Sequence, residues 1–264
     1  MRRALAEPSS TARNTASLLV ALVESDLRAR FGRGPWQLVK WLIDPFAAAG
    51  VYLVLVAFVL DRPGTAPGVS IACAVIPFQL VIAAVSSGLV CVQSRRAIIL
   101  NMGFRRGLIP IAGVLTETVA FVASLLLFVV MMGAHGVAPT PAALWLVPAL
   151  LVTLVLGIAS AYPAALLGLW FPDLRLFAIS LVRTIFFLAP GLVPLSEIPG
   201  VYAEIAKANP FTGLFEAYRS ALLYGRTPPA WQLLIPLAWA AFLLLVSLPV
   251  YRREERHLAK VVDL

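Results

Sequence analysis

Few side chains in this sequence have the type and spacing that catalysis requires. The chain contains no GxxxxGK[ST] loop for binding the phosphates of ATP, and neither the HExxH nor the GxSxG pattern occurs. His135 and His257 are far apart and lie outside the apolar segments. Cys73 and Cys91 would lie at opposite ends of a helix about 27 Å long, too far apart for a disulfide. We therefore expect no catalytic site, no metal site and no cofactor in this chain.

Two charged residues, Glu117 and Arg183, interrupt long apolar segments. A charge inside a membrane-spanning helix costs several kcal/mol and usually has a partner or a water-filled cavity. Both residues are expected roughly 10–14 Å deep from the same side of the membrane, so they could pair. The alternatives are a structural ion pair, an Arg183 side chain that reaches the headgroups, and a polar lining for a transported anionic headgroup. Phe46 and Tyr52, in the first apolar segment, could stack on sugar rings or pack against lipid and protein.

Residues 93–107 carry four arginines and no acidic residue. The arginines are Arg95, Arg96, Arg105 and Arg106, and they surround the apolar residues 97–100. Such a segment fits an orientation signal that binds anionic lipid. It fits equally well a short amphipathic helix that docks on a cytosolic partner, and the composition does not choose between the two.

The composition indicates an integral membrane protein. Of the 264 residues, 61% are apolar and 13% are charged, and the mean hydropathy is +0.91, whereas a soluble domain is about 45–50% apolar and about 25% charged. Six apolar segments have about the length that a bilayer requires. We therefore predict an all-α fold, with one transmembrane domain over residues 1–264 and spans at roughly 42–60, 70–92, 108–132, 143–170, 176–195 and 231–251.

The net charge of +8 is distributed unevenly along this topology. With both termini in the cytoplasm, sixteen Lys and Arg residues lie on the cytoplasmic side and four on the outer side. This bias is the positive-inside signal and sets the orientation. Because the chain lacks the polar surface of a nucleic-acid binder, we expect no nucleic acid as a partner. Residues 14–40 are expected to form a helix in the cytoplasmic membrane interface, or else a soluble helix packed on a partner.

Four sequence blocks resemble one known family. Residues 209–219 read NPFTGLFEAYR and look like the NP-x-x-x-x-x-E-A-Y-R segment of polysaccharide export permeases, the membrane subunits of ATP-binding-cassette exporters for O-antigen, capsule and teichoic acid. Residues 26–31 (DLRARF) with Asp44-Pro45 resemble the family's D-L-x-x-R-[YF] and [ND]-P blocks. Residues 95–110 resemble its cytoplasmic loop. Residues 171–174 (FPDL) and 187–190 (FLAP) resemble its R-D-L and F-x-x-[TS]-P blocks.

The resemblance implies a homodimer in which each copy pairs with a separate nucleotide-binding ATPase subunit. ATP and Mg²⁺ would then be bound by that subunit. The helix at 14–40 and the loop at 93–107 would contact the ATPase, the loop as a coupling helix whose candidate residues are Arg95, Arg96, Ile98, Ile99, Asn101 and Arg105. Residues 197–224 would form short re-entrant helices that cap the exit, with the candidate outer-gate residues Asn209, Pro210, Glu216, Tyr218 and Arg219.

The function that follows is export of a lipid-linked polysaccharide or teichoic-acid-like polymer across a bacterial plasma membrane by a multi-pass permease subunit that is not itself an enzyme. The first alternative keeps the exporter and changes the cargo to a drug or a small glycolipid. The second is an intramembrane enzyme or a scaffold for a cell-wall complex, which would need catalytic groups that the sequence does not show.

Overall fold

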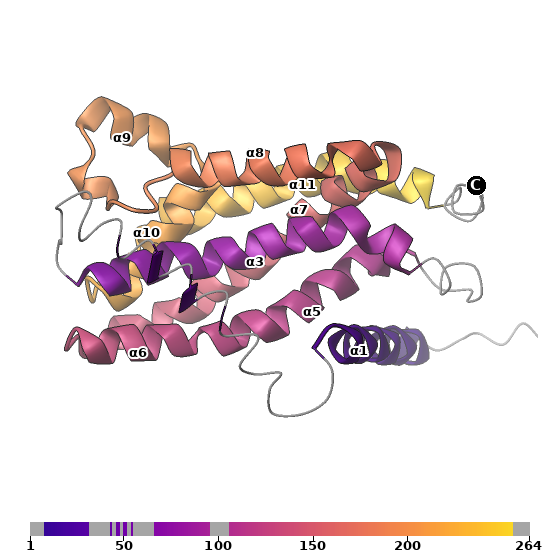
Figure 1. The fold of residues 1–264 in the computed structure, drawn as a ribbon, viewed down its shortest axis with the longest axis horizontal. Coiled ribbons are helices and arrows are strands. Elements are labelled where there is room, and N and C mark those ends of the chain that lie inside the picture. The colour runs from indigo at the N-terminus through magenta and orange to yellow at the C-terminus, as the bar shows by residue number, and fades with distance from the viewer. Residues whose placement is uncertain are drawn as a thin grey trace, which may run out of the picture.

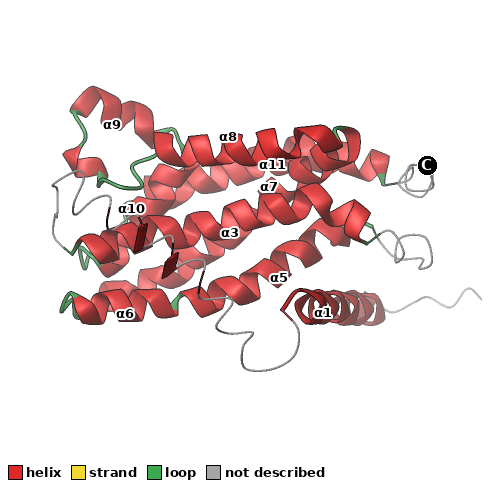
Figure 2. Cartoon of the chain, viewed as in Figure 1, coloured by secondary structure: helices red, strands yellow, loops and turns green. Residues whose placement is uncertain are grey.

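The computed structural model describes residues 8–31, 66–95 and 106–255, together with 43, 46–47, 50–51 and 54. Within these residues the secondary structure is helical, joined by short loops and turns, with no strand (Figure 2). Most of the predicted first span, including Tyr52 and Asp44-Pro45, lies outside the described residues, and so do residues 96–105. The all-α prediction is confirmed for the described part of the chain.

Long helices lie side by side and form a bundle (Figure 1). The bundle helices are α3 (Pro67–Ser94), α5 (Leu108–Ser124), α6 (Leu126–Ala134), α7 (Leu146–Trp170), α8 (Arg175–Leu188) and α11 (Trp231–Glu254). A 3₁₀ turn over Pro141–Trp145 precedes α7. We call the two ends of the bundle the α1 end, where α3 and α11 finish, and the α9 end, where they begin (Figure 1).

Four of the described helical segments are long and apolar enough to cross a membrane. They are Pro67–Ser94, Leu108–Ala134, Pro141–Trp170 and Trp231–Glu254, and they correspond to the predicted spans at 70–92, 108–132, 143–170 and 231–251. The chain is thus a multi-pass membrane protein by the length and composition of its helices.

The predicted helix at 176–195 is shorter than expected. Helix α8 ends at Leu188, after 14 residues, whereas a straight span needs about 20. Ala189 already has an extended backbone (φ −86°, ψ 154°), because the residue before a proline is disfavoured in the α region and Pro190 follows. The expectation that this helix runs to residue 195 was wrong, and residues 189–199 form an irregular segment with one 3₁₀ turn at Leu195–Glu197.

Two short helices connect α8 to α11 at the α9 end. They are α9 (Gly200–Lys207) and α10 (Pro210–Leu222), and both lie within the range 197–224 for which short re-entrant helices were predicted. Because α8 finishes and α11 begins at the α9 end, the connection leaves and returns on one side of the bundle (Figure 1). Helix α10 does not lie on the surface but packs among α3, α7, α11 and Pro141–Trp145.

The N-terminal helix α1 (Pro8–Phe31) lies at the α1 end and packs on α5. It is seen almost along its axis in the view in which the bundle helices run across the page (Figure 1), so it crosses the bundle direction. The helix begins six residues before the predicted range of 14–40, and residues 32–40 lie outside the described part.

The tightest contact in the bundle joins α3 and α7, which share the most extensive helix interface. Gly88 of α3 faces the backbone of Ala161, and a Cβ atom added to it would lie 2.7 Å from the Ala161 carbonyl oxygen. A Cβ atom at Gly168 of α7 would lie 1.9 Å from the carbonyl oxygen of Leu89. Small residues at such positions let two membrane helices approach closely.

Gly168→Ala is therefore expected to lower the unfolding temperature of the purified protein in detergent. The added methyl group would meet backbone rather than a movable side chain, and overpacking of this kind costs about 1–3 kcal/mol. Gly133→Ala in α6 is the matched control, because nothing lies within 4 Å of a Cβ atom there. Equal unfolding temperatures for the two variants would contradict the close α3–α7 contact.

Candidate functional site

The first candidate site is the buried helix α10. Asn209 begins the helix: its side-chain oxygen accepts a hydrogen bond from the backbone N–H of Phe211 at 3.0 Å, which is an N-cap. Its amide nitrogen donates to the Ile185 carbonyl of α8 at 2.9 Å. Pro210 occupies the first helical position, where its missing N–H is no loss. Asn209 and Pro210 therefore start α10 and tie its beginning to α8.

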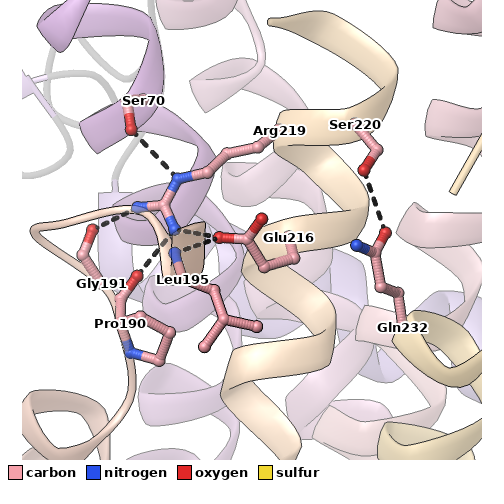
Figure 3. Close-up of polar contacts among 8 residues, drawn as sticks. All are labelled: Ser70, Pro190, Gly191, Leu195, Glu216, Arg219, Ser220 and Gln232. Carbon is pink, nitrogen blue, oxygen red and sulfur yellow. Dashed lines mark hydrogen bonds and ion pairs between the residues drawn. The ribbon is translucent and has the colours of Figure 1, made fainter. Parts of the chain in front are cut away.

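Arg219 is the centre of a polar network on α10, and its side chain is fully buried. Its Nε donates to the Ser70 hydroxyl at 3.0 Å. Its Nη1 donates to the Pro190 carbonyl at 2.7 Å and to Glu216 Oε1 at 2.9 Å, and its Nη2 donates to the Gly191 carbonyl at 2.7 Å (Figure 3). A buried guanidinium is tolerated only when its charge and donors are matched, as they are here.

The same network fixes the segment that follows α8. Glu216 Oε1 also accepts a hydrogen bond from the Leu195 backbone N–H at 3.0 Å. Together with the two carbonyls that Arg219 binds, this fastens residues 190–195 to α10 at three points (Figure 3). Three backbone polar groups of this irregular segment are thus satisfied by side chains of α10.

Two further contacts fasten α10 to the long helices. The hydroxyls of Tyr218 and Thr153 of α7 are 2.9 Å apart, and both side chains are buried. Ser220 donates to Gln232 Oε1 of α11 at 3.1 Å (Figure 3). The five predicted outer-gate residues therefore all lie at or on α10. Arg219 is one of the four cationic residues that the predicted topology places on the outer side, and its side chain lies inside the bundle, paired with Glu216.

A cavity of about 380 Å³ lies next to this network. It is formed by the end of α8 and the irregular segment after it, and its wall is mainly apolar with one carboxylate, Glu197. Phe187 is 60% exposed, whereas Phe186 is buried and stacks on Phe78 with a ring-centroid distance of 4.2 Å. One wall of the cavity is the Pro190–Gly191 backbone that Arg219 holds.

The second candidate site lies at the α1 end, at the described residues on either side of the segment 96–105. Arg95, the C-cap residue that follows α3, is 5% exposed. Its Nη1 donates to the Ile109 carbonyl of α5 at 2.7 Å, and its Nη2 forms an ion pair with Asp26 of α1. The Arg95 side chain therefore points into the protein, and its predicted role in coupling to the ATPase stays a prediction.

The other end of that loop is held by two tyrosines. Tyr162 of α7 donates to the Gly107 carbonyl at 3.0 Å, and Tyr251 of α11 donates to the Arg106 carbonyl at 3.3 Å. Their rings meet edge to face at 5.3 Å. Arg106 in turn donates to the Glu255 carbonyl at 2.9 Å. The remaining predicted loop residues, Arg96, Ile98, Ile99, Asn101 and Arg105, lie outside the described residues.

Three of the four predicted pathway residues, Glu117, Arg183 and Phe46, lie within the described part of the chain. Glu117 is buried in α5, whose neighbours are α1, α3, α6 and α7, whereas Arg183 is exposed on α8, which packs on α3 and α7. The structure therefore does not bring these two side chains together within one chain. Phe46 is half-buried and packs against the main core, and Tyr52 lies outside the described residues.

Among the residues that the structure describes, no three His, Cys, Asp or Glu side chains come together as metal ligands. Cys73 and Cys91 are both buried as free thiols on α3. The polar contacts described above therefore connect helices to one another inside the protein. They are suited to fixing the helices relative to one another and to passing a movement of one helix to its neighbours.

Comparison with known proteins identifies the relatives of this chain, although no family model matches it. The O-antigen export system permease protein RfbA of Myxococcus xanthus is 28% identical over 243 residues, which cover 90% of this chain and 93% of that protein. Two O-antigen export system permease proteins RfbA of Klebsiella pneumoniae are each 22% identical over 211 residues, 79% of this chain and 81% of theirs. This chain is similar to O-antigen export permeases. The resemblance predicted from four short blocks is confirmed over nearly the whole chain.

The block that most resembles the export permeases, residues 209–219, is also the one that builds the α10 network. Sequence reasoning missed the residues that hold these blocks in place, among them Ser70, Thr153, Tyr162 and Tyr251, and it did not identify Arg95 as the partner of Asp26. One signal was present: Asp26 interrupts the apolar side of α1, and such an interruption indicates a polar partner.

Proposed function

We propose that this chain is the transmembrane permease subunit of an ATP-binding-cassette exporter that moves a lipid-linked polysaccharide or teichoic-acid-like polymer outward across a bacterial plasma membrane. The observation that carries the proposal is the similarity to O-antigen export permeases over 90% of the chain. Those names favour a polysaccharide cargo over a drug or a small glycolipid, and they favour a transporter over an intramembrane enzyme or a scaffold.

The proposed topology has six spans with both termini in the cytoplasm, so that the α1 end faces the cytoplasm and the α9 end faces outward. Four helical segments of spanning length support it. The sequence excess of Lys and Arg supports the orientation, and α1 lies across the bundle at that end as an interfacial helix would (Figure 1). Helices α9 and α10 would then dip in from the outer face, and the α10 network would hold the outer gate.

The energy source is proposed to be a separate ATPase subunit, since the chain has no phosphate-binding loop of its own. That subunit would bind ATP and Mg²⁺ and would dock on α1 and on residues 96–105 at the α1 end. ATP binding would favour one state of the permease through contacts that differ between the closed and open pathways.

A second copy of this chain is proposed to complete the pathway. Arg183 is exposed on α8, a helix that also exposes the apolar side chains of Leu176, Phe177, Leu181, Phe187 and Leu188. A charge at membrane depth favours a polar neighbour or a water-filled cavity. A homodimer in which α8 faces the transport pathway would place Arg183 in such a cavity. There Arg183 would contact the anionic part of the cargo.

Co-purification tests the proposal. The chain is expressed together with a candidate nucleotide-binding ATPase subunit from the same organism, and the complex is isolated through a tag on the permease. We expect a stable complex with two copies of each subunit, whose rate of ATP hydrolysis rises when lipid-linked glycan is added. Recovery of the permease alone, with no ATPase bound under any nucleotide condition, would contradict the proposed function.

A further inference from the structure

The ion pair between Asp26 and Arg95 joins two parts of the molecule that are 69 residues apart in the sequence. Asp26 lies on α1 and its side chain is 32% exposed, whereas the Arg95 side chain is 5% exposed at the end of α3. Thr116 of α5 lies beside the same carboxylate, with 3.4 Å between its hydroxyl and Asp26 Oδ2. Helices α1, α3 and α5 therefore meet at one polar point.

The packing around Arg95 leaves its side chain little freedom. Gly113 of α5 lies against α3, and a Cβ atom there would be 2.4 Å from the Ser87 hydroxyl and 3.9 Å from Arg95 Nη1. The Ile109 carbonyl accepts from the same Nη1. Within the described residues, Asp26 is the acidic group that Arg95 contacts, so loss of this carboxylate would leave a buried cation without its counter-charge. An uncompensated buried charge is strongly unfavourable.

The position of this contact in the chain gives it a role. Arg95 is the last described residue before residues 96–105, the segment proposed to dock on the ATPase. Helix α1 is the other element proposed to dock there. The ion pair thus connects the two docking elements inside the permease itself, before any partner is bound.

We propose that the Asp26–Arg95 ion pair fixes α1 to the start of the 96–105 segment, so that the ATPase displaces both as one unit. This inference rests on the proposed function. Arg95 is a positioning residue: its buried side chain does not touch the ATPase or the cargo, and it acts by keeping α1 in register with α3 and α5. Without the ion pair, α1 would move independently of α3 and α5. Part of the movement that ATP hydrolysis produces in the ATPase would then not be transmitted to the helix bundle.

Two measurements on the full-length chain test this inference. The first is the distance distribution between spin labels at Ala21→Cys on α1 and Arg253→Cys on α11, both exposed positions, while the native cysteines are buried. The second is the number of glycans exported per ATP hydrolysed by the reconstituted complex. Both measurements are made on the chain with the native Asp26–Arg95 ion pair and on the Asp26→Asn variant. Glu24→Gln is the matched control, since it removes the same charge from an exposed ion pair on the same helix.

We expect Asp26→Asn to broaden the distribution of distances between the two labels. We also expect it to lower the number of glycans exported per ATP hydrolysed by about tenfold, while the ATPase stays bound. Glu24→Gln should change neither, and the exchange Asp26→Arg with Arg95→Asp should restore both in part. An unchanged distance distribution with unchanged export per ATP in Asp26→Asn would overturn the inference. If no ATPase binds the unchanged chain, the proposed function fails, while the label distance still decides whether the ion pair holds α1.

Discussion

Arg219→Gln is expected to remove most of the folded protein from a membrane preparation. The variant leaves the Glu216 carboxylate buried without its counter-charge, and it deprives the Pro190 and Gly191 carbonyls of their donors. Removing one partner of a buried ion pair costs about 3–5 kcal/mol, which is a large share of the 5–15 kcal/mol by which a typical domain is stable. The measurement is the yield of monodisperse protein in size-exclusion chromatography, together with its unfolding temperature.

Arg226→Gln is the control for this variant, because it removes the same charge from an exposed side chain a few residues beyond α10. A second comparison uses Glu216→Gln with Arg219→Gln. Because the double variant removes both charges, its loss of stability should be smaller than the sum of the two single losses. Equal stability of Arg219→Gln and Arg226→Gln would show that the network does not hold α10 in place.

Replacing residues 97–104 with glycine and serine is expected to reduce ATP hydrolysis by the complex to the rate of the ATPase subunit alone. The structure gives the physical reason at both ends of this segment. Arg95 connects its start to α1 and α5, and Tyr162 and Tyr251 connect its end to α7 and α11. If the ATPase moves this segment, the movement is therefore passed directly to α1, α5, α7 and α11. The replacement removes the side chains on which the ATPase would act.

The control for the loop replacement is the same change at residues 138–140, an exposed loop at the other end of the bundle. That variant should keep the glycan-stimulated rate of the unchanged complex. The measurement is phosphate release by complexes of equal permease content, with and without lipid-linked glycan. Full stimulation after replacement of residues 97–104 would contradict the proposed coupling route.

The long helices were predictable from the sequence because their signal is local. An apolar run of about 20 residues needs no knowledge of its neighbours, and α3, α7 and α11 appear close to where such runs occur. The short α8 shows the limit of this reasoning. Its apolar run continues to residue 195, but Pro190 and the extended Ala189 end the helix earlier.

The polar connections were less predictable because their partners are distant in the sequence. Arg219 and Ser70 are 149 residues apart, and Arg95 and Asp26 are 69 apart. A sequence shows a charge among apolar residues but not the residue that neutralises it. The sequence therefore did not show that the side chains of Arg219 and Arg95 are buried and paired inside the protein. Depth in the membrane alone allowed Glu117 and Arg183 to pair, but depth does not show which helices pack together, and the two residues lie on α5 and α8.

The most direct test of the central claim is to deplete this chain in cells that make it and to follow their lipid-linked glycan. The amount of polymer is measured on the cell surface by labelling intact cells and in the cytoplasmic leaflet by labelling after lysis. We predict that surface polymer falls while lipid-linked polymer accumulates inside, and that re-expression of the chain reverses both changes. Unchanged surface polymer without internal accumulation would contradict the assignment of this chain as an export permease.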